Sequence, residues 1–228
     1  GEVKPWDGNS IEVTSPIINP VTGKRTIIGS LPIFDEEDAI GVVQSASAAW
    51  DAGQGVWPQM PVRSRISAVE AVLKELELIR EDIVQVLMWE ICKNTGDAAK
   101  EFDRTMDYIR EAISILRQGD ERESFGKWTN VSGTYARVRR GPVGVNLMLA
   151  PFNYPLNEMY AMLIPALLMG NTVVMKLPTV GGLAHILTTG AFSRHLPPGV
   201  VNFISGSGRK TCAPIMKSGL VDMLGFIG

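Results

Sequence analysis

Short runs of consecutive apolar residues alternate with segments of helical length in the second half of the chain. The runs cover residues 145–150, 172–175 and 200–204, and a fourth begins near Met223. Such runs are typical of strands that are buried on both faces of a parallel sheet. Crossover helices are expected between them, at residues 155–169, 180–195 and 210–217. This alternation predicts an α/β fold with a doubly wound, Rossmann-like parallel sheet and right-handed crossovers.

The first half of the chain has the three-to-four-residue period of amphipathic helices. Asp35 and the acidic residues after it indicate a helix amino terminus. A long helix is expected from Ser64 to about Glu90, and another after the break at residues 94–97. We interpret their apolar stripes as core faces rather than as cofactor contacts.

Strand-like alternation appears outside these helices and the parallel sheet. Residues 11–13 and 25–28 flank a turn-rich segment at 19–23, which predicts an antiparallel hairpin. Residues 134–140 also alternate, as expected of a strand with one face toward solvent.

Composition and charge exclude several classes of function. Hydrophobic residues make up 45% of the chain and charged residues 20%, which is ordinary for a soluble globular protein. The net charge of -2 is spread along the chain, so no basic face is expected to gather nucleic acid or an anionic membrane. The longest apolar stretch, residues 159–175, is interrupted and too short to span a membrane. Because the amino terminus shows no secretion signal, a cytoplasmic location is expected.

Cysteine and histidine provide no recognisable reactive motif. Cys92 and Cys212 lie far apart, and we expect both to be buried structural thiols. His185 and His195 have no acidic partner at triad spacing and are interpreted as structural or surface residues. The sequence therefore indicates neither a metal site nor a catalytic triad.

Candidate chemistry follows the strands, because ligands of open parallel sheets bind beyond the carboxyl ends of the strands. Asn153 follows the first strand between two prolines, so its amide is either a donor to a developing oxyanion or part of a helix cap or turn. Lys176 ends the second strand. Its ammonium either faces a nucleotide ribose or phosphate, or it is an ordinary solvated surface lysine.

The third strand leads into a glycine-containing loop at residues 205–211. Gly206 and Gly208 leave room for a dinucleotide close to the backbone, but a plain tight turn would need the same residues. The loop is not a P-loop, because no glycine immediately precedes Lys210. It also departs from G-x-G-x-x-G, since Thr211 or Cys212 occupies the place of the third glycine.

The order of these motifs is more specific than any one of them, and over essentially the whole chain it resembles the aldehyde dehydrogenase superfamily. In chain order the motifs are Asn19-Pro20-Val21-Thr22-Gly23, Pro151-Phe152-Asn153-Tyr154-Pro155, Gly170-Asn171-Thr172-Val173-Val174-Met175-Lys176 and Gly206-Ser207-Gly208. The Asn-Tyr-Pro form, the Lys-x-Pro-Thr strand end and residues 90–94 look most similar to the non-phosphorylating, NADP-dependent glyceraldehyde-3-phosphate dehydrogenases.

The resemblance implies cofactor and oxyanion roles for five residues. Asn153 would supply the side-chain half of the oxyanion hole, and Lys176 would bind the adenosine ribose and an adjoining 2′-phosphate. Many NAD-using relatives carry a glutamate where Thr179 stands, so this neutral residue favours NADP, with NAD as the alternative. Gly206 and Gly208 would lie beside the adenosine half of the cofactor.

The resemblance also implies a substrate and an assembly. Arg104 and Tyr154 match positions that hold the substrate phosphate, which indicates a small aldehyde substrate such as glyceraldehyde 3-phosphate. Residues 1–117 and 141–228 would form the cofactor-binding domain. Residues 118–140 would form part of an oligomerisation hairpin, so that a homo-oligomer of the full-length protein is expected.

The chain departs from the family pattern at its last residues. The family has a Phe-Thr-Gly-Ser type sequence where this chain reads Phe226-Ile227-Gly228. The family's general-base glutamate and nucleophilic cysteine would lie beyond this point, so these 228 residues are expected to be an inactive, truncated part of a larger enzyme. Two other functions remain open: a non-catalytic nucleotide-binding or interaction module, and a dehydrogenase of another small aldehyde or semialdehyde.

Overall fold

A four-stranded parallel sheet lies at the centre of the protein. The structure is a computed structural model that describes residues 1, 3, 5–121, 128–137 and 140–228. The strands are β5 (Val145–Leu149), β6 (Thr172–Lys176), β7 (Val201–Ile204) and β8 (Met223–Phe226), in the order β7-β6-β5-β8. Every neighbouring pair is parallel. The predicted α/β class and all four predicted strands are confirmed.

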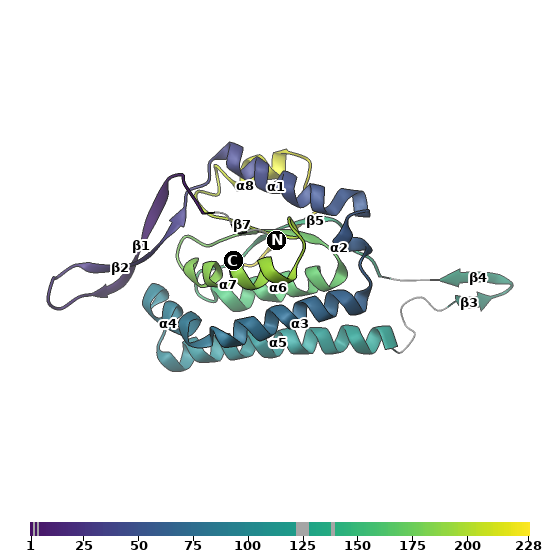
Figure 1. Cartoon of the computed structure of the whole chain (residues 1–228), viewed down its shortest axis with the longest axis horizontal. Coiled ribbons are helices and arrows are strands. Elements are labelled where there is room, and N and C mark those ends of the chain that lie inside the picture. The colour runs from purple at the N-terminus through teal and green to yellow at the C-terminus, as the bar shows by residue number, and fades with distance from the viewer. Residues whose placement is uncertain (2, 4, 122–127, 138–139) are drawn as a thin grey trace.

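Helices cover both faces of this sheet (Figure 1). On one face lie α1 (Glu36–Trp50) and α8 (Cys212–Lys217). On the other lie α6 (Pro155–Met169) and α7 (Leu183–His195), the crossovers that follow β5 and β6. The apolar strands are therefore buried from both sides, as their sequence pattern indicates.

An outer layer of helices packs on α6 and α7. It consists of α3 (Val62–Leu78), α4 (Arg80–Ile91) and α5 (Thr95–Glu121), and a short turn η1 (Asp51–Gly53) and helix α2 (Val56–Gln59) connect α1 to it. The predicted single helix from Ser64 to Glu90 is wrong, because the chain breaks at Ile79, which ends α3 and begins α4. The break allows α4 to pack against α5, α7 and the first hairpin. No described helix has both the length and the apolar character needed to cross a membrane.

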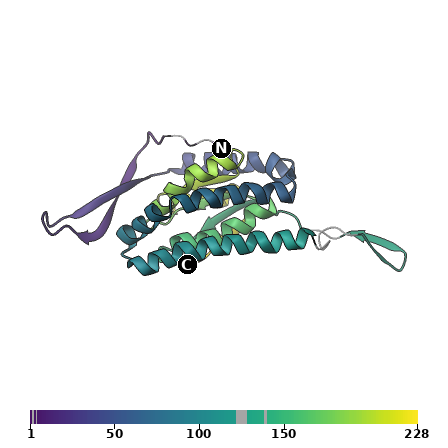
Figure 2. The ribbon, with the colours of Figure 1, turned by 60° about the horizontal axis from the view of Figure 1, so that its bottom comes forward.

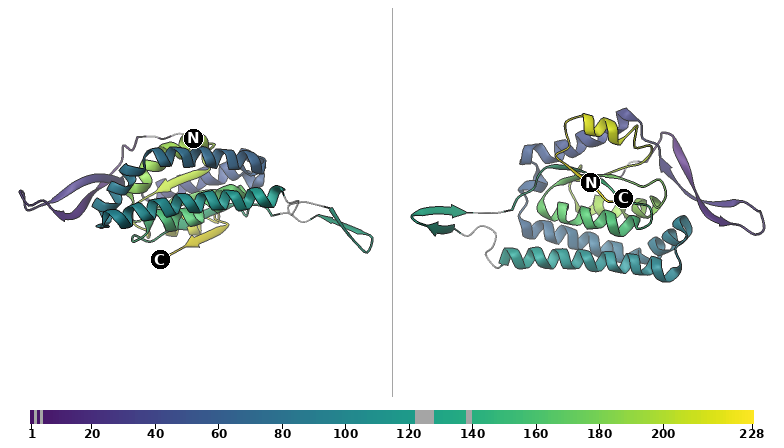
Figure 3. Two further views of the ribbon diagram at one scale, coloured as in Figure 1. Left: turned by 90° about the horizontal axis from the view of Figure 1, so that it is seen from below. Right: turned by 180° about the vertical axis from the view of Figure 1, so that it is seen from behind.

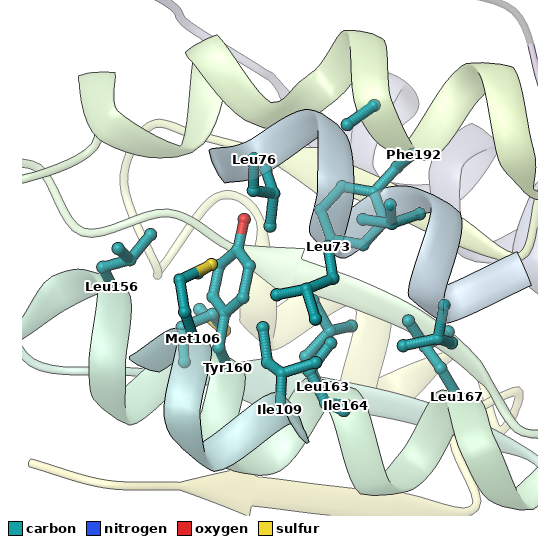
Figure 4. Packing of buried hydrophobic residues seen from close by; sticks show 14 of the residues in the cluster. Leu73, Leu76, Met106, Ile109, Leu156, Tyr160, Leu163, Ile164, Leu167 and Phe192 are labelled. Carbon is teal, nitrogen blue, oxygen red and sulfur yellow. The ribbon is translucent and has the colours of Figure 1, made fainter. Parts of the chain in front are cut away.

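The largest hydrophobic cluster fills the space between this outer layer and the sheet. Figure 4 shows α3, α5, α6 and α7 meeting through Leu73, Leu76, Met106, Ile109, Tyr160, Leu163, Ile164, Leu167 and Phe192. The one polar atom of the buried Tyr160 is bonded, since its hydroxyl donates to Thr188 Oγ1 at 2.8 Å. A second cluster on the opposite face joins α1 to the strands through Val43, Leu147 and Ile204.

Two antiparallel hairpins project from opposite ends of the molecule (Figures 1 and 2). The first, β1 (Ser10–Ile18) with β2 (Arg25–Pro32), confirms the predicted hairpin. The second pairs β3 (Trp128–Val131) with β4 (Thr134–Arg137). Of the segment 118–140, residues 122–127 and 138–139 lie outside the described residues, and α5 continues to Glu121. The proposed division into a cofactor domain and an oligomerisation hairpin therefore stays a prediction.

Candidate functional site

The carboxyl ends of the four parallel strands form one edge of the sheet. In the register of the sheet, Leu149 lies opposite both Lys176 and Phe226, and Lys176 also lies opposite Ile204. The segments after β5, β6 and β7 therefore start side by side. This arrangement brings the loops that carry Asn153, Lys176 and Gly206 to a common edge, where α/β proteins bind ligands.

Lys176 lies on the face of the sheet that α1 and α8 cover, since side chains alternate along a strand and its neighbour Met175 belongs to the opposite core. Its half-buried ammonium donates a hydrogen bond to the Leu177 carbonyl oxygen at 2.7 Å. Burial lowers the pKa of Lys176, and the nearby Cys212 thiol partly opposes that shift. An ammonium has three donors, so two remain for a ligand. Thr179, three residues further on, is exposed.

The glycine turn after β7 is fixed by the last residue of β2 and by the segment that joins β2 to α1. Ser205 Oγ donates to the Pro32 carbonyl, and a Cβ on Gly206, whose φ is +100°, would meet the Phe34 backbone at 3.3 Å. Gly206 is therefore required by close packing and by its left-handed conformation. Gly208 is different, because a Cβ there would meet only Cys212 Sγ, at 4.0 Å. The backbone at Gly208 is open, and the side chains of Arg209 and Lys210 beside it are exposed.

Asn153 lies in the turn between β5 and α6 and is exposed. Tyr154 is the N-cap residue of α6, Pro155 occupies its first turn, and no side chain caps the helix from that position. Capping of α6 by Asn153 is therefore not seen among the described residues, whereas the other part of that alternative, a place in the turn, is where Asn153 lies. The Asn153 amide remains available to a ligand.

Glu101 of α5 takes the place of a local cap for α6. Its Oε1 accepts hydrogen bonds from the backbone N–H groups of Leu156, at 3.0 Å, and Asn157, at 3.3 Å. Its other oxygen forms an ion pair with Lys93. The Lys93 ammonium also lies 3.8 Å from the centroid of the Tyr154 ring. Sequence reasoning assigned no role to Glu101 or Lys93, since the bonded groups on α6 are 55 and 56 residues away from Glu101 along the chain.

Glu90 holds the start of α7 in the same way. Its buried carboxylate accepts from the N–H groups of Gly181, Gly182 and Leu183, at 2.7, 3.0 and 3.1 Å. Burial raises the pKa of Glu90, and these three hydrogen bonds oppose the shift. Gly181 in turn packs against Pro155, where a Cβ would come within 2.9 Å. Glu101 of α5 therefore holds the start of α6, and Glu90 of α4 holds the start of α7. Both helix starts lie next to the Asn153 turn.

Arg104 lies on α5 and not with the residues around Lys176. It is exposed, three residues after Glu101 and four before Tyr108, so all three project from one flank of the helix. That flank faces α6, because the Tyr108 hydroxyl donates to the Ala161 carbonyl at 3.1 Å. Arg104 therefore lies on the flank of α5 that faces α6.

The cysteines differ from expectation, whereas the histidines agree with it. Cys92 is exposed and Cys212 half-buried, so the prediction of two buried thiols is wrong. Cys92 ends α4 in a left-handed conformation, which turns the chain at the surface. His185 is buried in the core against the Tyr160 ring, with a pKa that burial lowers to about 4, and His195 bonds Glu75. In the described part of the chain, no three His, Cys, Asp or Glu side chains are placed to hold a metal ion.

Comparison with known proteins shows which enzymes this chain is similar to. Residues 6–228 match the sequence model of the aldehyde dehydrogenase family. An NADP-dependent glyceraldehyde-3-phosphate dehydrogenase of Streptococcus equinus is 33% identical over 215 residues, which are 93% of this chain and 44% of that relative. A 3-succinoylsemialdehyde-pyridine dehydrogenase of a Pseudomonas species is 30% identical over 93% of this chain and 42% of its own length.

Solved structures agree. The NADP-dependent glyceraldehyde-3-phosphate dehydrogenase of Bacillus halodurans, complexed with NADP, superimposes with a TM-score of 0.81 at 30% identity, over 96% of this chain and 44% of the other. An NAD-dependent aldehyde dehydrogenase of Sinorhizobium meliloti gives a TM-score of 0.85 at 24% identity, over 98% and 43%, and shares the fold. The chain spans slightly less than half the length of these relatives.

Proposed function

The chain belongs to the aldehyde dehydrogenase family, and we propose that the whole protein oxidises a small aldehyde, glyceraldehyde 3-phosphate, to the acid with reduction of NADP. In this proposal the 228 residues contribute cofactor binding and one oxyanion donor. The nucleophilic cysteine and the general base come from the remainder of the protein. One observation carries the proposal. The exposed Asn153, Lys176 and the open turn at Gly208 all follow strands whose carboxyl ends lie at the same edge of the sheet.

The residues around Lys176 fit the adenosine half of a dinucleotide. Two free donors of the Lys176 ammonium would hold the ribose hydroxyl and an adjoining 2′-phosphate. The neutral, exposed Thr179 adds no charge that would repel this phosphate. Gly206 and Gly208 would lie beside the adenosine, with the backbone at Gly208 open to its approach. A bound nicotinamide supplies the hydride acceptor.

Asn153 would stabilise the oxygen of the aldehyde as it becomes negatively charged. Attack by a thiolate on the carbonyl carbon places the new charge on that oxygen, and a donor aimed there beforehand stabilises the transition state more than the substrate. The Asn153 turn is suited to this task, because Glu101 and Glu90 hold the helices on either side of it.

The substrate is proposed from the Tyr154 end of the site. Arg104 and Tyr154 would hold a phosphate group, with Arg104 supplying a planar, permanently charged donor. The similarity to glyceraldehyde-3-phosphate dehydrogenases supports this choice. Relatives named for semialdehydes support the alternative of another small aldehyde or semialdehyde.

Steady-state oxidation by the whole protein tests the proposal. Wild type is expected to oxidise glyceraldehyde 3-phosphate with NADP, and Asn153→Ala to lower kcat about 10²- to 10³-fold while folding normally. Arg104→Met should raise KM for this aldehyde and leave that of unphosphorylated glyceraldehyde unchanged. Full activity in Asn153→Ala would refute the oxyanion role. A wild-type preference for a semialdehyde would show that the substrate is a semialdehyde and not glyceraldehyde 3-phosphate.

Calorimetric titration with NADP and NAD provides the cofactor arm of the same experiment. Lys176→Ala should weaken NADP binding, and Thr179→Glu should shift the preference toward NAD, because a carboxylate repels the 2′-phosphate. Lys217→Ala, an exposed lysine at the end of α8, is the matched control. Tight NADP binding in both site variants would exclude the proposed cofactor site. The 228 residues alone are expected to show no turnover.

A further inference from the structure

Lys93 occupies a rigid corner between α4 and α5. The residue before it, Cys92, ends α4 in a left-handed conformation with φ of 57°. The residue after it, Asn94, precedes α5 and caps it, since its Oδ1 accepts from the Asp97 N–H at 2.9 Å. The Lys93 side chain is only 12% exposed, which is unusual for a lysine. The backbone of Lys93 is thus held on both sides, and its side chain is largely buried.

Two groups share this ammonium. One is the fully buried carboxylate of Glu101, whose second oxygen accepts the first N–H groups of α6. The other is the ring of Tyr154, whose centroid lies 3.8 Å from Lys93 Nζ. A cation over the face of an aromatic ring is attracted to it, and more strongly where water is excluded. The contact fixes the Tyr154 ring, while no described residue bonds the Tyr154 hydroxyl, which stays open to a ligand.

We propose that Lys93 is a positioning residue for the anionic end of the substrate. It holds the ring of Tyr154 so that the phenol hydroxyl is aimed beside Arg104. Through Glu101 it is also tied to the start of α6, the helix whose N-cap residue is Tyr154. The inference rests on the proposed function, because it assigns Lys93 to the phosphate end of that site.

The kinetic test compares two aldehydes in the whole protein. Lys93→Met is expected to raise KM for glyceraldehyde 3-phosphate about tenfold, with the KM of unphosphorylated glyceraldehyde within about twofold of wild type. Lys93→Arg should recover most of the loss, because it keeps the charge. Lys100→Met, an exposed lysine on α5, should change neither constant. An equal loss with both aldehydes, or no loss with either, would overturn the proposal.

A spectroscopic measurement separates this inference from the choice of substrate. In protein labelled with 3-fluorotyrosine, the Tyr154 fluorine resonance is assigned by Tyr154→Phe. Lys93→Met should shift that resonance and leave those of Tyr108, Tyr135 and Tyr160 in place. An unmoved Tyr154 resonance would show that Lys93 does not position the ring. If wild type does not favour the phosphorylated aldehyde but the resonance moves, the substrate proposal fails and the positioning of Tyr154 by Lys93 stands.

Discussion

Single buried carboxylates determine how the helices around the candidate site begin. The first N–H groups of a helix lack partners within it and attract negative charge. Glu90 supplies that charge to α7, and Glu101 supplies it to α6. Both side chains come from the outer helical layer, so the packing of that layer also sets the geometry of the Asn153 turn.

Glu75 provides a prediction about acid stability. It bonds Arg194 and His195 from α7, and hydrogen bonding to Arg194 above all lowers its pKa to about 2. Because the pKa is lower in the folded state, the stabilisation is present above the ordinary value near 4.5 and is lost as the pH falls toward 2.

The difference in unfolding free energy between wild type and Glu75→Gln, measured by urea titration, should therefore be largest near pH 6 and shrink toward pH 3. The exposure of Arg194 limits it to about 1 kcal/mol or less. A difference that does not vary with pH would contradict this assignment. Glu12→Gln, at an exposed position on β1, serves as the control.

At the scale of elements, local sequence marks some helix ends and not others. Asp35 and Asp38 form a reciprocal capping box at the start of α1, as the acidic cluster there indicates. Gly170 ends α6 in a left-handed conformation. In contrast, Ile79 separates α3 from α4 without a glycine, a proline or a side-chain cap.

The capping box leads to a prediction about α1. Asp35→Ala removes the acceptor for the Asp38 N–H, a bond of 3.0 Å, and should lower the unfolding free energy by about 1 kcal/mol. Asp35→Ser should retain most of the stability, since a hydroxyl can accept the same bond. Chemical denaturation measures the unfolding free energy of both variants, and its slope against denaturant concentration should match that of wild type. Equal stability of Asp35→Ala and wild type would show that the cap is unimportant to α1.

At the scale of the whole molecule, the two hairpins lie apart from the layered body (Figure 3). The β3–β4 hairpin contacts no other described element extensively. Trp128 and Tyr135 are both about two-thirds exposed. In the register of the hairpin they fall on one face, since Tyr135 pairs with Asn130 and Arg137 with Trp128. Such exposed aromatic surface is typical of protein interfaces, in agreement with the proposed oligomerisation hairpin.

Assembly of the whole protein tests this proposal. Tyr135→Glu places a charge on the aromatic face and should reduce the mass measured by light scattering, with an unchanged circular dichroism spectrum. Ala136→Glu, on the opposite face, is the matched control and should leave the mass closer to that of wild type. A mass unaffected by Tyr135→Glu would show that this face of the hairpin takes part in no interface.

The sequence by itself determined the features that depend on near neighbours. Residues 145–149 and 172–175 form buried strands because nearly all of their side chains are apolar. Asp35 caps α1 because its partner is three residues away. The order of the strand-end motifs also indicated the family and placed Asn153, Lys176 and Gly206 at one edge of the sheet.

Only the tertiary structure decided the features whose partners are distant in sequence. The break at Ile79 follows from the packing of α4 against α7 and β1. Cys92 is exposed because the chain turns there between two helices. The contacts of Lys93 and Glu101 with Tyr154 and the start of α6 join groups more than fifty residues apart. Local periodicity carries no record of such pairs, because they exist only once the outer helices have packed on the layer that covers the sheet.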